Sequence, residues 1–103
     1  MKVRIKGNSI RFRLTKSEVG HFCQAGKIEE RTNFDTAVFS YAVKLDENGE
    51  ELSAEFKDAS ISLLLPKKLL GDWASNNQVG FQNTLQLENG NELFLLLEKD
   101  FTC

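Results

Sequence analysis

The fold is decided by residues 2–31, KVRIKGNSIRFRLTKSEVGHFCQAGKIEER, because the chain contains a second, diverged copy of this stretch. A shift of fifty-one places brings six identical pairs together: Lys6/Lys57, Ser9/Ser60, Ile10/Ile61, Leu14/Leu65, Lys16/Lys67 and Gly20/Gly71. Apolar residues also meet, as Phe22 does with Trp73 and Ile28 with Val79. A period near fifty is the size of a supersecondary unit that packs against its copy. The sequence therefore predicts an internal duplication.

The first copy begins with a predicted hairpin. Residues 1–6 and 10–14 alternate apolar and polar side chains, which is typical of strands, and Gly7-Asn8 is a favourable two-residue turn between them. The expected cross-strand partners are Val3 with Phe12, Ile5 with Ile10, Lys2 with Arg13 and Arg4 with Arg11. This register gives the hairpin one apolar face and one basic face.

A helix and two strands are expected next. Thr15 and Glu18 have the spacing of a capping box, which fixes the start of a helix, and Gly26 is a common residue just after a helix end. The helix is therefore predicted to run to about Ala25, and strands are predicted over residues 27–33 and 38–45.

The second copy repeats this order. Strands are predicted over residues 51–57 and 60–65, followed by a helix that starts at Pro66 and carries the apolar residues Leu69, Leu70 and Trp73. Residues 79–87 and the last strand are expected to pair through a three-residue loop, Glu88-Asn89-Gly90, with Leu85 opposite Leu93 and Phe81 opposite Leu97. Between the copies, Asn48-Gly49 predicts a further hairpin with Leu45 opposite Leu52.

These elements predict an α+β fold built from a duplicated strand–strand–helix–strand–strand unit. We expect about eight mostly antiparallel strands and two helices, arranged as a pseudo-two-fold barrel or as two packed sheets. All 103 residues are expected to form a single domain, with one repeat at about 1–47 and the other at about 50–101.

Composition limits the class of protein. An apolar fraction of 41% and eight Phe residues indicate a packed core, and no apolar run approaches the roughly 18–20 residues that a membrane span needs. Two cysteines make no disulfide framework, so a reducing cytoplasm is the expected location. The sequence leaves the oligomeric state open.

Few residues have the spacing of a catalytic or metal site. The single histidine, His21, lies two residues from Cys23 on the predicted helix, so their side chains diverge and neither a metal site nor a Cys–His pair is expected. Cys23 aligns with Ala74, which favours a buried packing role. Gly20 and Gly71 lie inside the two predicted helices, which suggests close backbone approach there. We therefore predict no catalytic residue, no metal and no cofactor, and we favour a protein that is not an enzyme.

The basic face of the first hairpin is the feature that the fold does not require. It carries Lys2, Arg4, Lys6, Arg11 and Arg13. Like charges directly opposite one another destabilise a strand pair, so something should neutralise them. The second copy has Glu55, Ser62 and Leu64 where the first has Arg4, Arg11 and Arg13, so the unit itself does not need these charges.

Two explanations of the basic face stay open. The first is an internal row of acids, for which Glu98 and Asp100 on the last strand, or Glu29, are candidates. The second is an anionic ligand or a protein partner. Nucleic acid is disfavoured, because the net charge is −2 and no aromatic residue shares the face for base stacking.

The phrases KVRIKGNSIRFRLTKSEV (2–19), VGF (79–81) and LLLEKDFTC (95–103) resemble a small uncharacterised bacterial family, a domain of unknown function. The resemblance implies a bacterial, cytoplasmic protein of about this size that extends slightly past Cys103, and it implies no activity. We expect a small binding or interaction module that uses the basic face. The alternative is an enzyme or small-ligand carrier with a site in the cleft between the two repeats.

Overall fold

The computed structural model describes residues 1–100, which form eight strands and two helices. In chain order these elements are β1 (Lys2–Lys6), β2 (Ser9–Leu14), α1 (Lys16–Ala25), β3 (Lys27–Asn33), β4 (Val38–Asp46), β5 (Ser53–Lys57), β6 (Ser60–Pro66), α2 (Lys67–Leu70), β7 (Gly80–Gln86) and β8 (Glu92–Lys99). The α+β class predicted from the sequence is confirmed.

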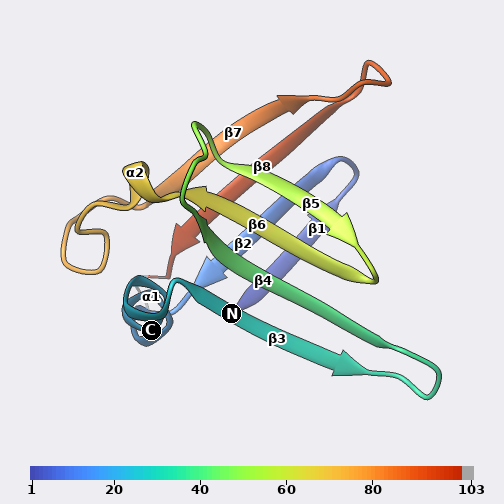
Figure 1. Ribbon diagram of the computed structural model, residues 1–103, viewed down its shortest axis with the longest axis horizontal. Helices are drawn as coiled ribbons and strands as arrows, with labels where there is room; N and C mark the ends of the chain where they lie inside the picture. Colours follow the sequence, from blue (N-terminus) through green and yellow to red (C-terminus); the bar gives the residue numbers. More distant parts are fainter. Residues whose placement is uncertain (101–103) are drawn as a thin grey trace.

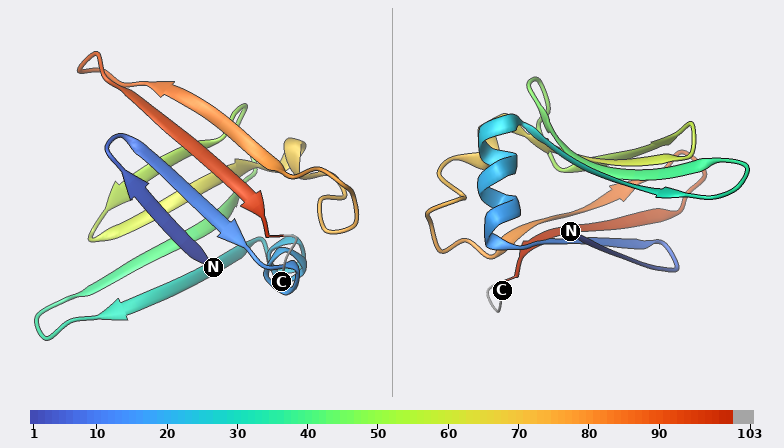
Figure 2. Two further views of the ribbon diagram at one scale, coloured as in Figure 1. Left: turned by 180° about the vertical axis from the view of Figure 1, so that it is seen from behind. Right: turned by 90° about the horizontal axis from the view of Figure 1, so that it is seen from below.

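The strands form two packed four-stranded sheets, and there is no closed barrel. Sheet A has the order β1-β2-β8-β7, and sheet B has the order β3-β4-β6-β5. The strands of the two sheets run across one another (Figure 1), as in orthogonal sheet packing. Seen edge-on, the sheets are two layers, and α1 closes one end (Figure 2). The four hairpin turns lie toward the opposite, open end.

The strand order shows how the two copies combine. Each sheet contains the first hairpin of one copy and the second hairpin of the other. Exchanging each strand for its equivalent in the other copy, β1–β4 for β5–β8, converts the strand order of sheet A into that of sheet B. Each sheet has one parallel pair, which is β2 with β8 in sheet A and β4 with β6 in sheet B. A duplicated unit gives this pseudo-two-fold arrangement when its copies exchange hairpins.

Local signals were accurate in the β1–β2 and β7–β8 hairpins and in α1. Arg4 lies opposite Arg11 and Phe81 opposite Leu97, as predicted. The β7–β8 loop has Gly90 in the left-handed conformation with φ of 87°. Both hydrogen bonds of the capping box between Thr15 and Glu18 are present, and α1 ends before a left-handed Gly26.

The predicted hairpin at Asn48-Gly49 is wrong. β4 does not pair with β5, because β6 lies between them and pairs with β4 in parallel. Most of β6 is buried, and its run Leu63-Leu64-Leu65 is apolar on both faces, which favours a central position in a sheet. Turn chemistry alone could not show that this strand would take the inner place.

The second helix is shorter than predicted. α2 is a single turn of four residues, and Pro66 gives it no side-chain cap. Gly71 follows the helix with φ of 51°, so the prediction of a helical Gly71 is wrong. Ile28 pairs with Val43, which lies beside Leu63, and Phe81 pairs with Leu97, which lies beside Phe12. Leu63 and Phe12 are equivalent residues of the two copies. Ile28 therefore corresponds to Phe81 in the structure, and its predicted alignment with Val79 is wrong.

Close backbone approach occurs at a glycine that we did not single out. A Cβ atom added to Gly20 or to Gly71 would meet nothing within 4 Å, so the predicted packing of these two glycines is wrong. A Cβ atom on Gly80 would lie 2.1 Å from the carbonyl oxygen of Leu97. The bare backbone of Gly80 therefore lets β7 reach β8 at the first residue of the strand.

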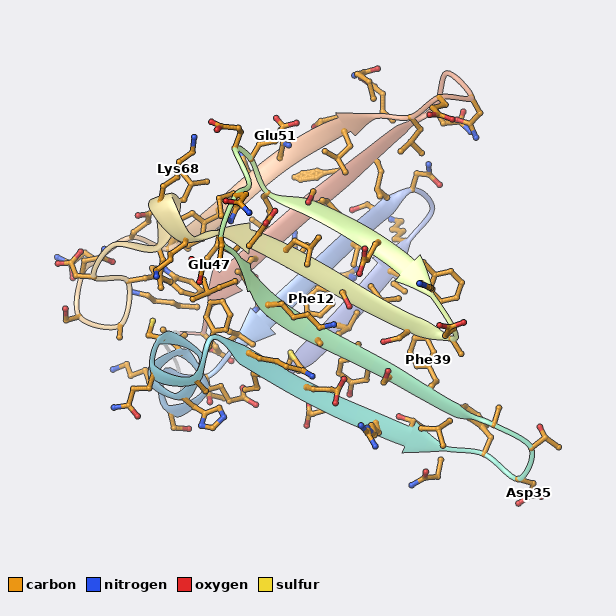
Figure 3. The ribbon with its side chains drawn as sticks, in the orientation of Figure 1. Phe12, Asp35, Phe39, Glu47, Glu51 and Lys68 are labelled. Atoms are coloured by element: carbon orange, nitrogen blue, oxygen red, sulfur yellow. The ribbon has the colours of Figure 1, made fainter. Side chains whose placement is uncertain are left out.

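The core lies between the two sheets. Phe12, Phe22 and Trp73 are fully buried, with Phe12 where the sheets overlap (Figure 3). The Trp73 ring meets Phe81 edge-on at 5.1 Å. Cys23 is half-buried and packs against this core, which confirms only part of its predicted burial; Cys103 lies outside the described residues. Neither helix of residues 1–100 has the length and apolarity to cross a membrane.

Candidate functional site

The outer face of sheet A carries the five predicted basic residues. Strand pairing arranges this face in rows that run across β1, β2, β8 and β7. From the hairpin turn inward, the rows are Lys6–Ser9–Phe94–Thr84, Arg4–Arg11–Leu96–Gln82 and Lys2–Arg13–Glu98–Gly80. The structure therefore brings the five cations together as the sequence predicted.

One row is neutralised inside the protein. The Nε atom of Arg13 donates a hydrogen bond of 2.9 Å to Glu98, and its Nη2 atom lies 2.7 Å from the same carboxylate oxygen. The expectation that Glu98 and Asp100 hold Arg4 and Arg11 is wrong for Glu98, because the parallel register places Leu96 beside Arg11. Asp100 is buried at the end of the last strand.

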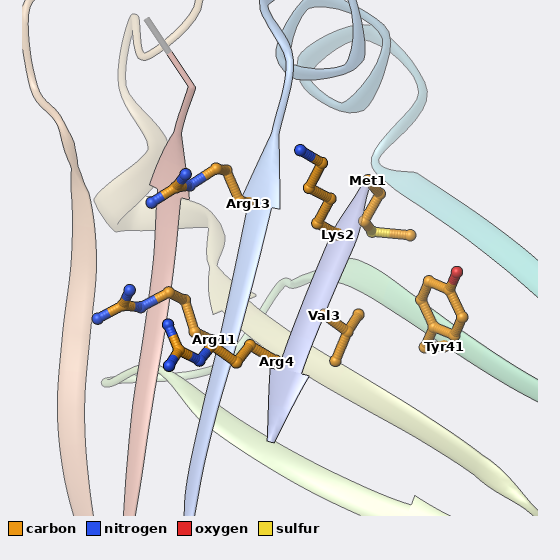
Figure 4. A pocket seen from close by; sticks show the side chains of 7 residues that line it. All are labelled: Met1, Lys2, Val3, Arg4, Arg11, Arg13 and Tyr41. Atoms are coloured by element: carbon orange, nitrogen blue, oxygen red, sulfur yellow. The ribbon is translucent and has the colours of Figure 1, made fainter. Parts of the chain in front are cut away.

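The other basic side chains have no carboxylate partner within residues 1–100. In the described part of the chain, no acid lies within ion-pair distance of Lys2, Arg4, Lys6 or Arg11. Glu29 pairs with Lys27 and Arg31 on its own strand. Arg4 and Arg11 are both exposed and lie directly opposite one another. Their side chains extend from β1 and β2 in the same direction, toward β8 (Figure 4).

These arginines border two adjoining cavities. The larger has a volume of about 400 Å³ and is lined by Met1, Lys2, Val3, Arg4, Arg11, Arg13 and Tyr41. The smaller, of about 180 Å³, is lined by Arg4, Lys6, Ser9 and Arg11. Val3 and Tyr41 lie between the sheets, so the larger cavity reaches around β1. β1 is an edge strand of sheet A in the described part of the chain.

Acids near this cavity are already paired. The α-ammonium group of Met1 contacts Glu18 and lies 3.5 Å from the Oε2 atom of Glu30. Burial and the negative charges of Glu30 and Glu18 raise the pKa of Tyr41. The phenol therefore stays protonated at neutral pH and can donate a hydrogen bond into the cavity.

The central row of the equivalent face of sheet B has the opposite charge. The row that corresponds to Arg4–Arg11–Leu96–Gln82 is Glu55–Ser62–Ala42–Glu29. The two rows have the same place in the same fold, but one is basic and the other acidic. The Arg4–Arg11 pair is therefore a property of sheet A and not of the architecture.

A second concave site lies between the sheets at the open end, and the sequence did not single out its residues. It has a volume of about 370 Å³, and its lining is almost entirely apolar: Ile5, Ile10, Phe39, Ala54, Glu55, Phe56, Ile61 and Leu93. Six of these residues form three pairs in which the two members occupy corresponding positions in the two copies: Ile5/Phe56, Ile10/Ile61 and Phe39/Leu93. We call this site the apolar cleft. The signal in the sequence is that the fifty-one-residue shift aligns the apolar residues Ile5 and Phe56, and both are exposed in the structure.

Catalytic groups do not converge at either site. His21 is exposed on α1, away from the linings of both sites. Within residues 1–100, no three His, Cys, Asp or Glu side chains are grouped so that they could hold a metal ion. Glu55 is the only ionisable side chain in the lining of the apolar cleft.

The fold and the two sites define an α+β protein of two exchanged-hairpin sheets, with a basic outer face and an apolar cleft at the open end. The chain belongs to the family of unknown function DUF7009, whose model matches residues 1–103. This confirms the resemblance to a domain of unknown function. No curated protein matches the chain, and no solved structure does either.

Proposed function

We propose that the protein is a binding module that recognises an anionic ligand on the outer face of sheet A. Arg4 and Arg11 are the principal contacts, and Lys2 and Lys6 add positive charge on either side. Arg13 lines the larger cavity, and its guanidinium group is held in place by Glu98. A guanidinium group binds carboxylate and phosphate oxygens with two parallel hydrogen bonds, which suits a pair of exposed arginines.

The pairing of Arg4 with Arg11 is the observation that carries this proposal. Two like charges in one cross-strand pair destabilise a hairpin, and this row contains no acid. The equivalent row of sheet B avoids the repulsion, so the fold has an alternative. Binding of an external anion supplies the missing negative charge and offsets the repulsion between the two arginines.

Calorimetric titration with inorganic triphosphate tests the proposal. The double variant Arg4→Gln/Arg11→Gln should lose most of the affinity. The matched control is Lys16→Gln/Lys57→Gln, which removes the same charge from residues that line neither basic cavity. Equal loss in both variants would show non-specific attraction only, and unchanged affinity in the arginine variant would refute the proposal.

The setting of this function is also a proposal. A free thiol at Cys23 agrees with a reducing bacterial cytoplasm. An enzyme with its active site in the cleft between the repeats is less well supported, because Glu55 has no second titratable group beside it in that lining.

A further inference from the structure

The apolar cleft lies on the inner side of the edge strand β1, and the larger basic cavity extends from this inner side around the strand to its outer face. Ile5 faces the cleft and Arg4, the preceding residue on β1, faces the cavity. Among residues 1–100, no strand pairs with the outer edge of β1 in sheet A. A ligand can therefore pass around this edge from one site to the other.

The inner walls of the two sites are continuous. Val3, which lines the cavity, and Ile5, which lines the cleft, lie on the same side of β1. On β4, Tyr41 lines the cavity and Phe39 lines the cleft, and their ring centroids are 6.1 Å apart. On each strand, residues two positions apart therefore line the cleft and the cavity in turn.

We infer that this composite site takes a single-chain amphipathic anion, such as a fatty acid, with its hydrocarbon chain in the apolar cleft and its head group at Arg4 and Arg11. The inference rests on the proposed anion-binding function and adds the class of ligand. Charge complementarity argues for an anionic head, because Arg4 and Arg11 in the adjoining cavity have no acidic partner among residues 1–100. The apolar lining argues for a hydrocarbon chain.

The size and exposure of the cleft fit this occupant. A volume of about 370 Å³ holds roughly a dozen non-hydrogen atoms at about 30 Å³ each, which is close to a ten-carbon chain. Phe56 is 71% exposed and Ile5 is 56% exposed at its rim. Large apolar side chains with this exposure gain from contact with an apolar partner.

The inference is tested with decanoate, with butanoate, which has a shorter chain, and with decan-1-ol, which lacks the charge. Binding of each compound, below its aggregation limit, is measured by calorimetry and by the shifts of amide NMR signals. Each methylene that enters the cleft should tighten binding about three- to fourfold, from about 0.8 kcal/mol per methylene. The amide signals of Ala54, Phe56 and Leu93 should shift with decanoate. Arg4→Gln/Arg11→Gln should weaken decanoate and leave decan-1-ol unchanged.

Phe56→Ser should weaken decanoate about tenfold, because it removes a wall of the cleft. The matched control is Phe34→Ser, which changes a similarly exposed Phe, at 64%, that lines neither site. Both side chains are exposed, so both variants should fold.

The possible outcomes separate the two proposals. Arginine-dependent anion binding without dependence on chain length would overturn the amphipathic ligand and leave the proposed function intact. Equal binding of decanoate and decan-1-ol, with no effect of the arginine variant, would overturn the inference. If triphosphate affinity is also unchanged in that variant, the proposed function fails as well. A change of oligomeric state in Phe56→Ser, without a change in decanoate affinity, would assign the cleft to a second copy of this chain and overturn the inference.

Discussion

Arg13 lies opposite Glu98 across the parallel pair of β2 and β8, and its Nε atom donates a hydrogen bond of 2.9 Å to the carboxylate. This pair shows that the last strand does supply an acid to the basic hairpin. The strand supplies no acid to Arg11, because the next outward-facing residue of β8, beside Arg11, is Leu96. One arginine is thus neutralised, and two are left facing one another.

Reversing the Arg13–Glu98 pair should preserve part of its stabilisation. Arg13→Glu and Glu98→Arg should each lower the free energy of unfolding by about 0.5–1 kcal/mol, because the pair is only partly buried and solvent screens it. The double variant Arg13→Glu/Glu98→Arg should recover part of this loss. Urea unfolding measures the coupling, and strictly additive losses would show that the two charges do not interact.

Arg11→Glu should stabilise the protein while it abolishes anion binding. It places a carboxylate opposite Arg4, which replaces a repulsive cross-strand pair with an attractive one worth about 0.2–1 kcal/mol. Thermal unfolding and triphosphate titration on the same sample measure the two effects. A variant that loses stability together with affinity would mean that Arg11 has a structural role, contrary to our account.

Gly20→Ala should stabilise the protein by up to about 1 kcal/mol, because Gly20 lies within α1 and an added Cβ atom meets open space. Gly80→Ala is the matched control with the opposite sign, since its Cβ atom would lie 2.1 Å from a backbone oxygen. Chemical unfolding of both variants checks the pair. If Gly20→Ala instead destabilises the protein, Gly20 is closely packed against a neighbour, as its position in the sequence suggested, and this prediction is wrong.

The contribution of Glu18 should depend on pH. Burial acts to raise the pKa of Glu18, but hydrogen bonds from the α-ammonium group and from Thr15 lower it below its ordinary value of 4.5. A carboxylate whose pKa is depressed by folding stabilises the protein fully above its unfolded-state pKa, and loses this effect as the pH falls through the folded-state value. The stability difference between the wild type and Glu18→Gln should therefore shrink as the pH falls below the ordinary pKa of 4.5, in urea unfolding. A difference that is constant with pH would contradict this assignment.

Local sequence signals predicted the parts of the fold that local chemistry determines. The capping box of Thr15 and Glu18, the left-handed Gly90 and the registers of the β1–β2 and β7–β8 hairpins agree with the structure. Each depends on residues within a few positions of one another, so the signal is contained in a short stretch.

Competition between distant strands could not be predicted in the same way. The turn residues Asn48-Gly49 favoured a hairpin, but β6 is the more apolar neighbour and takes the place beside β4. The partner of Glu98 depended on the register of the parallel β2–β8 pair, which no turn fixes. The grouping of the five cations followed from one hairpin, whereas the apolar cleft needed the crossing of two sheets.

The salt dependence of binding to inorganic polyphosphate tests the central claim most directly, because it counts the cations that contact the ligand. If Lys2, Arg4, Lys6 and Arg11 all touch phosphates, the plot of log affinity against log salt concentration should have a slope of about −3, at about 0.7 per contact. Arg4→Gln/Arg11→Gln should reduce the slope to about −1.4, and Lys16→Gln/Lys57→Gln should leave it unchanged. A wild-type slope that the arginine variant does not alter would contradict the assignment of the basic face as the binding site.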